Sequence, residues 1–215
     1  MIEPGPVRDR VEALRDRIGR PDVRIVAVTK GFGPDAISAA AEAGLVDIGE
    51  NYAQELIAKL SHVDAPNRPF RLNVHFIGRL QSNKVGLIAP VVDLWQSVDR
   101  FSLVSAIAAR KPGARVLVQV NVSDEPSKGG CAPADAAALV DAASVAGLRV
   151  EGLMTVGRTG SPTEAAVGFR MLRRLVDGLG LEVCSMGMSD DLDAAVAEGS
   201  TMVRIGTALF GSRGG

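Results

Sequence analysis

Residues 24–29 read RIVAVT and are followed directly by Lys30. The run is short and rich in β-branched side chains, and the turn residues Gly19-Arg20-Pro21 precede it, which is the pattern of a buried β-strand. A lysine at the end of such a strand stands where the next loop begins. The stretch therefore predicts a strand that presents Lys30 at the edge of a sheet.

Strand-like and helix-like stretches alternate from this run to the end of the chain. The expected strands are 24–29, 45–48, 73–77, 92–97, 115–122, 148–154, 181–184 and 201–205. The helix-like stretches between them are 34–43, 53–60, a shorter one after Gln81, 101–109, 133–146, 163–179 and 190–198. Eight strands in this rhythm predict an α/β fold with a parallel sheet, and eight strands also close a barrel.

A further amphipathic helix is expected upstream of the first strand, because apolar side chains recur at helical spacing over residues 7–18. The prediction is therefore a single TIM-type (β/α)8 barrel over residues 1–215, with an extra N-terminal helix. An open, doubly wound sheet is the structural alternative, since periodicity does not distinguish closure.

Composition excludes several functional classes. The 24 Lys and Arg residues balance 25 Asp and Glu, so no overall field attracts nucleic acid or anionic lipid. The N-terminus is too charged for a signal peptide, and no apolar run reaches the roughly 18 residues of a membrane helix. The two cysteines, far apart, read as ordinary thiols of a reducing compartment. We expect a cytoplasmic protein that binds neither nucleic acid nor membrane.

Lys30 is the most informative polar residue at the predicted strand ends, where parallel α/β folds gather their functional side chains. Desolvation at a barrel mouth lowers the pKa of an amine, which an amine needs in order to attack a carbonyl. The alternatives are an ion pair with Glu50 or Asp99, or a side chain that extends into solvent.

Two C-terminal loops are candidates for binding a phosphate. Ser189 lies in the stretch GMSDD (187–191) just before a helical run, and Gly206-Thr207 follows the eighth expected strand. Helix N-termini offer free N–H groups to phosphates, and barrels often bind them after strands 7 and 8. Plain helix capping is the alternative for Ser189.

Arg204 and His75 are charged or titratable residues inside expected strands. A buried guanidinium costs several kcal/mol unless it is paired, so Arg204 needs a partner. That partner is either a carboxylate on a neighbouring strand or a ring nitrogen of a cofactor. For His75, a core histidine is favoured over a catalytic base. The two histidines of the chain are too far apart in sequence to suggest a metal site.

Together these stretches resemble the pyridoxal phosphate homeostasis proteins, a family similar to the N-terminal barrel of alanine racemases. The resemblance covers nearly the whole chain. The motifs that carry it are AVTK (27–30), DIGENY (47–52), HFIG (75–78), LQSNK (80–84), SVD (97–99), QVNVS (119–123), GLMT (152–155), SMGMSDD (185–191) and VRIGT (203–207). One departure is Gln96, at a position where the family often has histidine.

The resemblance implies one pyridoxal 5′-phosphate-binding barrel and assigns roles to its residues. Lys30 would hold the cofactor as an internal aldimine, and Arg204 would face the pyridine nitrogen. The residues implied to hold the phosphate are Ser189, Gly206 and Thr207. Further pocket-lining candidates are Asn51, His75 and Ser185.

The implied function is vitamin B6 homeostasis without robust catalysis. Alanine racemases use a second base, a tyrosine from a C-terminal β-domain, and this chain ends at Gly215 with Tyr52 as its one tyrosine. Candidate partners are apoenzymes that use pyridoxal phosphate, and the chain is expected to be a monomer. The alternative is an amino-acid racemase or lyase of low activity that uses the same cofactor. A phosphosugar-barrel enzyme is a remote third reading.

Overall fold

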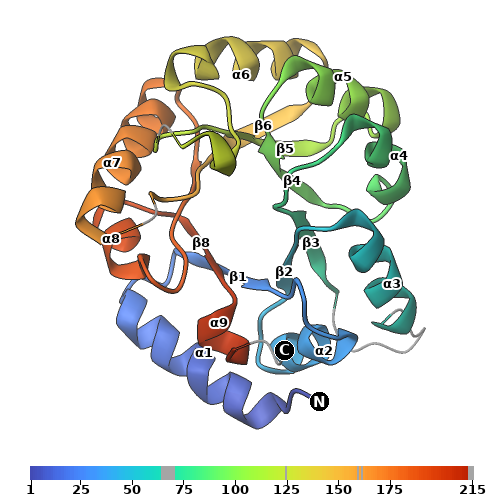
Figure 1. The fold of residues 1–215 in the computed structure, drawn as a ribbon, viewed down its shortest axis with the longest axis vertical. Helices are drawn as coiled ribbons and strands as arrows, with labels where there is room; N and C mark the ends of the chain where they lie inside the picture. Colours follow the sequence, from blue (N-terminus) through green and yellow to red (C-terminus); the bar gives the residue numbers. More distant parts are fainter. Residues whose placement is uncertain (64–70, 124, 159, 161, 213–215) are drawn as a thin grey trace.

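Eight short parallel strands close into a barrel in the order in which they occur along the chain (Figure 1). The computed structural model describes residues 1–63, 71–123, 125–158, 160 and 162–212. The strands are β1 (Arg24–Val28), β2 (Asp47–Glu50), β3 (Asn73–Phe76), β4 (Leu94–Val98), β5 (Arg115–Gln119), β6 (Arg149–Met154), β7 (Val183–Ser185) and β8 (Met202–Ile205). The predicted closed (β/α)8 barrel is confirmed, and the open sheet is excluded.

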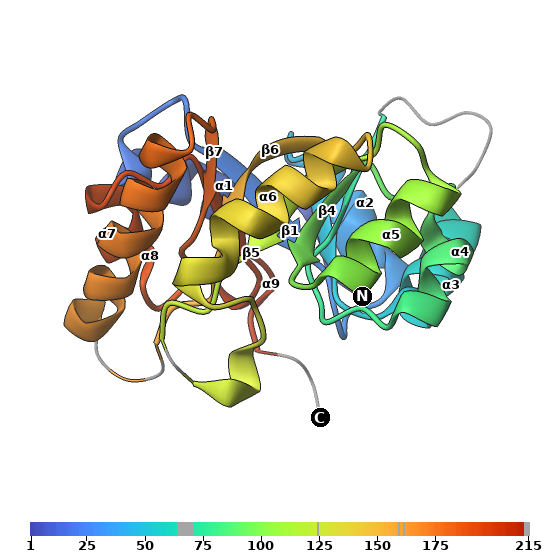
Figure 2. The same ribbon diagram turned by 90° about the horizontal axis from the view of Figure 1, so that it is seen from above.

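Helices surround the barrel in the ribbon view (Figure 1). They are α1 (Pro4–Ile18), α2 (Pro34–Glu42), α3 (Ala53–Val63), α4 (Val85–Ile88), α5 (Phe101–Arg110), α6 (Ala136–Val145), α7 (Pro162–Gly178), α8 (Leu192–Ala197) and α9 (Thr207–Phe210), with short 3-10 turns at Ser82–Lys84, Pro126–Lys128 and Pro133–Asp135. Figure 2 shows α9 and the segment that follows β5 on the same side of the barrel, which is the mouth formed by the carboxyl ends of the strands.

All eight expected strands exist, but some of their ends differ from the prediction. The second strand was expected at 45–48 and runs from Asp47 to Glu50, so Gly49 and Glu50 belong to the strand and Asn51 follows it. Leu45 is buried before the strand begins. Its apolar side chain therefore packs in the α2–β2 connection, and the hydrophobic run alone placed the strand two residues too early.

The predicted N-terminal helix is also present, and it has a structural reason. The helix after β8, α9, has four residues and leaves that part of the barrel wall poorly covered. Helix α1 packs against α2, α8 and α9. Its buried face joins a core cluster with Val203, Ile205 and Leu209; that face consists of Val7, Val11, Leu14 and Ile18. Burying such side chains stabilises a fold by about 1.5–3 kcal/mol each.

The interior of the barrel is more polar than the layer between barrel and helices. Six apolar side chains form an interior cluster: Val26, Leu94, Leu117, Met154, Val183 and Met202. Polar side chains of the barrel strands are buried too, namely His75, Gln96, Gln119, Ser185 and Arg204. A TIM barrel interior is ordinarily filled with branched apolar side chains, so these polar residues point to a function.

In the described residues, no helix has the length and apolar character needed to cross a bilayer.

Gly152 in β6 lets this strand approach β7 closely, and we predict that Gly152→Ala destabilises the barrel. An added Cβ would lie 1.9 Å from the backbone oxygen of Val183, so the strands would have to separate. We expect the free energy of unfolding in urea to fall by about 3 kcal/mol. The control is Gly178→Ala, where a Cβ meets nothing within 4 Å, and the change should stay below about 1 kcal/mol. Equal stability of both variants would contradict the close approach.

Candidate functional site

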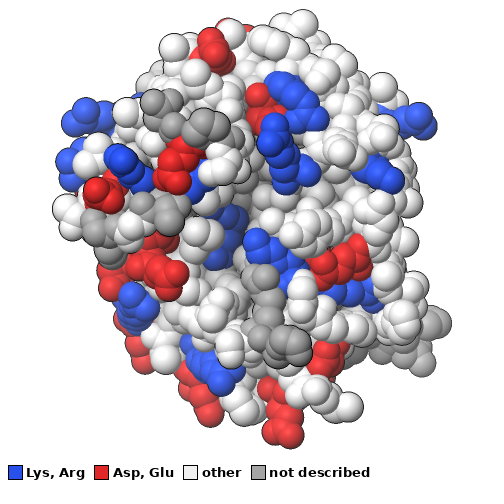
Figure 3. Space-filling model, in the orientation of Figure 1, with Lys and Arg blue, Asp and Glu red and all other residues white. Residues whose placement is uncertain are grey.

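The barrel mouth brings the ends of β1, β2, β7 and β8 together. Strand β8 pairs with β1 so that Ile205 lies opposite Ala27, and a Cβ on Gly206 would lie 3.3 Å from the Val28 carbonyl oxygen. Gly206 and the half-buried Lys30 therefore lie at adjoining strand ends. Figure 3 shows Lys and Arg side chains bordering a hollow near the middle of this face, which suits an anionic ligand.

The backbone on both sides of Lys30 is held by side chains from helix α3. Lys59 donates from Nζ to the Thr29 carbonyl oxygen at 2.6 Å, and the Gly31 N–H donates to Glu55 Oε1 at 2.6 Å. Lys59 and Glu55 also form an ion pair one helical turn apart, at 2.5 Å. These contacts hold the backbone of Thr29 and Gly31 and thereby position the backbone of Lys30 between them.

The same cluster contains a buried carboxylate at the end of β2. Glu50 Oε1 accepts hydrogen bonds from Lys59 Nζ and from Thr29 Oγ1, both at 2.6 Å. Burial raises the pKa of Glu50 above its ordinary value, although the bonds from Lys59 and Thr29 oppose the shift. The cation that Glu50 binds in this cluster is thus Lys59.

Arg204 lies in β8 with 4% of its surface exposed. Its Nη1 donates to Ser185 Oγ at 2.7 Å and its Nη2 donates to the Thr155 carbonyl oxygen at 2.6 Å. Burial lowers the pKa of Arg204 to about 10, opposed by the charge of Asp191. The guanidinium is therefore still charged at neutral pH. The hydrogen-bond partners found in the described residues are both neutral, so the expected alternative of a carboxylate partner on a neighbouring strand is not what holds it.

The three residues expected to hold a phosphate lie at two adjoining loops. The backbone N–H of Ala208, next to Thr207, donates to Ser189 Oγ at 3.2 Å. The turn that contains Ser189 is closed by Asp191, whose Oδ1 accepts from the Met188 N–H at 2.6 Å. Ser189 thus connects the loop after β7 with the start of α9, and Gly206 and Thr207 follow β8 at the same place.

Asn51 follows β2 and has a side-chain oxygen that lacks a partner. Its Oδ1 is buried and accepts no hydrogen bond from the described residues. A Cβ on Gly78 would lie 2.1 Å from the Asn51 backbone oxygen, so the glycine of HFIG lets the two loops meet. A buried acceptor without a donor is costly unless a ligand or water supplies one. This atom is therefore ready to bind a donor.

His75 and Ser185 lie deeper in the barrel than the loop residues. Ser185 is fully buried beneath the mouth and accepts from Arg204. His75 Nε2 is 3.0 Å from Asp47 Oδ1, and Asp47 begins β2 at the amino-terminal end of the barrel. The structure therefore brings Lys30, Asn51, Ser189, Arg204, Gly206 and Thr207 to the mouth or just below it, with Ser185 next to Arg204 and His75 further inside.

Sequence reasoning missed Lys59 and Glu55, which hold the Lys30 segment. The spacing of an acid and a lysine four residues apart on one helix was visible, but it is a common surface pattern. The better signal was that Lys59 falls on the apolar side of α3, between Leu56 and Leu60, all three of which are buried. A lysine on a buried helical face needs a partner beneath it.

The chain is similar to proteins of one family along nearly its whole length. The model of the alanine racemase N-terminal domain family matches residues 2–214. A pyridoxal phosphate homeostasis protein from Pseudomonas aeruginosa is 44% identical over 218 residues, covering 96% of this chain and 93% of the relative. The chain belongs to the pyridoxal phosphate homeostasis protein family. A member from Escherichia coli is 38% identical over 222 residues, covering 96% of this chain and 94% of the relative.

Solved structures agree with this membership. PipY of Synechococcus elongatus, solved with pyridoxal phosphate bound, has a TM-score of 0.86 at 32% identity and covers 95% of this chain and 99% of its own. An alanine racemase from Clostridium difficile has a TM-score of 0.76 at 13% identity, and the match covers 97% of this chain and 57% of the racemase. The second likeness shows the shared alanine racemase-like barrel.

For this family member we predict that Lys59→Met destabilises the fold. The change leaves the Glu50 carboxylate buried without its cation, which typically costs about 3–5 kcal/mol of unfolding free energy. The double variant Glu50→Gln/Lys59→Met removes both charges and should recover most of that loss. Urea unfolding of the wild type, both single variants and the double variant measures the coupling. Additive effects of the two single changes would contradict a direct pair.

Proposed function

We propose that this chain binds pyridoxal 5′-phosphate covalently through Lys30 and serves vitamin B6 homeostasis as a carrier of that cofactor. The family membership supports this proposal, since relatives at 38–44% identity are named pyridoxal phosphate homeostasis proteins and PipY was solved with the cofactor bound. The residues at the barrel mouth fit the group, because the ends of β1, β8 and β2 carry an amine, a buried cation and an unsatisfied acceptor.

The observation that carries the proposal is the burial of Arg204 with neutral partners. A buried charge is tolerated when acceptors satisfy it, and Arg204 uses a hydroxyl and a carbonyl oxygen. A pyridine nitrogen is a further neutral acceptor. Because the guanidinium only donates hydrogen bonds, it would hold that nitrogen unprotonated. Pyridoxal phosphate supplies an aldehyde that forms an imine with a lysine amine, with loss of one water, and a ring whose electron-sink strength depends on nitrogen protonation.

The other residues of the site would bind and orient the cofactor. Lys30 provides the amine, and the cluster of Lys59 and Glu55 fixes its backbone. The Ser189 hydroxyl and the backbone N–H groups of Gly206 and Thr207 would donate to the phosphate. Asn51, Ser185 and His75 would line or support the pocket wall, with Asn51 Oδ1 as its open acceptor.

We infer that the protein is a carrier and not a catalyst from one consequence of the proposed Arg204 contact and one observation. An unprotonated pyridine nitrogen is a weak electron sink, which disfavours carbanion chemistry. Tyr52, the one tyrosine in the sequence, has 60% of its surface exposed at the start of α3 and is poorly placed to act as a desolvated second base. We further propose that the chain acts as a cytoplasmic monomer and passes the cofactor to apoenzymes that require it.

Lys30→Ala should abolish covalent binding of pyridoxal phosphate. The wild type titrated with the cofactor should develop the visible absorption band of a lysine imine, and borohydride should bleach it and add the cofactor mass to the peptide containing Lys30. The Lys30→Ala spectrum should remain that of the free aldehyde. The matched control is Lys84→Ala, in the turn after β3, which should behave like the wild type. A band of equal strength in Lys30→Ala would overturn the assignment.

The loaded protein should not racemise or cleave amino acids at a rate that depends on Lys30. The physical reason is the weak electron sink described above. Chiral chromatography of L-alanine incubated with loaded wild type and with Lys30→Ala measures this. Faster formation of D-alanine or of cleavage product with the wild type would favour the alternative, a racemase or lyase of low activity.

A further inference from the structure

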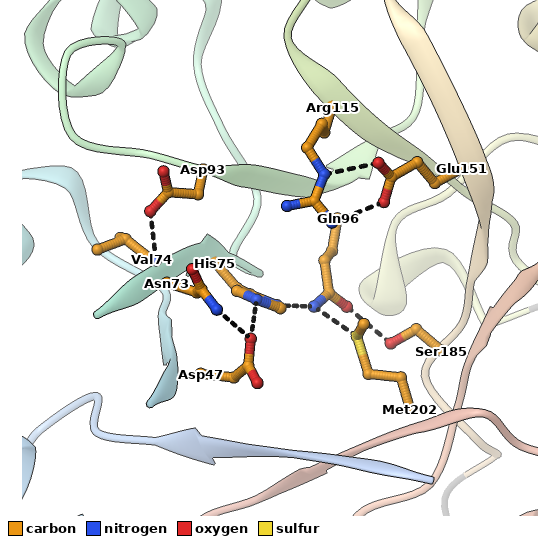
Figure 4. Close-up of polar contacts among 10 residues, drawn as sticks. All are labelled: Asp47, Asn73, Val74, His75, Asp93, Gln96, Arg115, Glu151, Ser185 and Met202. Atoms are coloured by element: carbon orange, nitrogen blue, oxygen red, sulfur yellow. Dashed lines mark hydrogen bonds and ion pairs between the residues drawn. The ribbon is translucent and has the colours of Figure 1, made fainter. Parts of the chain in front are cut away.

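A continuous chain of hydrogen bonds crosses the barrel interior from Arg204 to Asp47 and passes through four more strands. Arg204 Nη1 bonds Ser185 Oγ, Ser185 Oγ bonds Gln96 Oε1, and Gln96 Nε2 bonds His75 Nδ1, each at 2.7 Å. His75 Nε2 then bonds Asp47 Oδ1 at 3.0 Å. Figure 4 shows the four members from Ser185 to Asp47 aligned in this order.

The two ends of this chain fix the direction of every bond in it. A guanidinium can only donate, and an ionised carboxylate can only accept. Ser185 accepts from Arg204, so its hydrogen is available to Gln96 Oε1. The Gln96 amide then donates to His75 Nδ1, which must be unprotonated, and the Nε2–H of His75 donates to Asp47. Reversing the Gln96 amide would leave Ser185 without an acceptor for its hydrogen and would point a lone pair of neutral His75 at the carboxylate.

Because the members of this hydrogen-bond chain are buried, breaking any one of the bonds costs free energy. Ser185 and Gln96 are fully buried and His75 is 1% exposed, so a lost bond would not be replaced by solvent. At the far end, burial acts to raise the pKa of Asp47, but hydrogen bonds from His75 and Asn73 and the charge of Arg24 lower it below its ordinary value. The carboxylate therefore remains ionised at neutral pH and keeps accepting.

The Arg204 guanidinium, at the positively charged end of the hydrogen-bond chain, is the group that would face the cofactor. Each member has one orientation, so the Ser185 oxygen stands at one place with one lone pair toward Arg204 Nη1. The second anchor, the Thr155 carbonyl oxygen, holds Nη2. A planar guanidinium held at two nitrogens has no rotational freedom left. Removing the first anchor would let it turn about the second.

We propose that Gln96 and His75 are positioning residues that hold Arg204 in the orientation in which it faces the pyridine nitrogen of bound pyridoxal phosphate. This inference rests on the proposed function. It gives the polar interior of the barrel a role, because two residues that lie below the mouth would control the protonation of the cofactor ring through Ser185. The hydrogen-bond chain also explains why His75 is buried in this barrel.

The test compares three substitutions in β4. Gln96→Leu breaks the hydrogen-bond chain between Ser185 and His75. Gln96→His keeps it, because an imidazole offers one acceptor to Ser185 and one donor to His75. Trp95→Phe is the matched control: Trp95 is the preceding residue, belongs to the outer core and packs against Phe76 with ring centroids 6.5 Å apart.

The first readout needs no cofactor. The imidazole ¹H–¹⁵N spectrum of the apoprotein should show His75 as the Nε2–H tautomer, with the signal of His62, the other histidine, identified by His62→Gln. The tautomer signal should change in Gln96→Leu and remain in Trp95→Phe. A wild-type His75 that carries its proton on Nδ1 would overturn the order of the chain.

The second readout is the ¹⁵N shift of the ring nitrogen in protein loaded with [¹⁵N]pyridoxal phosphate, together with the rate of cofactor loss. We expect Gln96→Leu to move the shift toward that of a protonated ring and to speed the loss by roughly tenfold, as for one buried hydrogen bond. Gln96→His and Trp95→Phe should match the wild type. A changed His75 signal with an unchanged ring nitrogen would refute the positioning role.

Two further outcomes are distinguishable. If Gln96→Leu does not fold, Ser185→Ala removes the link next to Arg204 with little change of volume and must move the ring-nitrogen shift in the same direction; an unmoved shift refutes the proposal. If the wild type takes up no pyridoxal phosphate, the proposed function fails and the positioning role fails with it. The apoprotein spectrum would then still report whether the hydrogen-bond chain exists.

Discussion

The burial of one positive charge inside the barrel is the constraint on which the rest of this structure depends. Arg204 is on β8, where a TIM barrel ordinarily carries an apolar side chain. Its guanidinium needs acceptors, and it has two: the Ser185 hydroxyl and the Thr155 carbonyl oxygen. From Ser185 the hydrogen bonds continue through an amide and an imidazole to a carboxylate. The barrel interior thus contains an apolar cluster and a path of hydrogen-bonded polar side chains that links Arg204 to Asp47.

A second buried charge cluster lies at the ends of β1 and β2, beside β8, and has a different task. Lys59 forms ion pairs with both Glu50 and Glu55 beside the backbone of the Lys30 segment. The two clusters therefore fix the two ends of the candidate site independently, one at the amine and one at the guanidinium. Rigid supports of this kind hold reactive groups more precisely than loops do.

The likeness to alanine racemase separates fold from chemistry. A racemase at 13% identity shares the barrel, and the match covers 57% of its chain. At this identity the likeness shows the fold alone. Here Tyr52 is exposed and the guanidinium of Arg204 is held by neutral groups, and both features fit the proposed role of holding the cofactor.

The sequence by itself determined the alternation of eight strands and helices, the position of Lys30 at a strand end and the motifs at the mouth, because these follow from local periodicity and local order. Tertiary structure decided the exact span of β2, the pairing of Lys59 with Glu50, and the path from Arg204 to Asp47. Lys59 and Glu50 are 9 positions apart but lie on different elements, and the path joins residues as far apart as Gln96 and Ser185, 89 positions from each other. Their partners depend on which side chains face the closed interior, and closure is a property of the whole sheet.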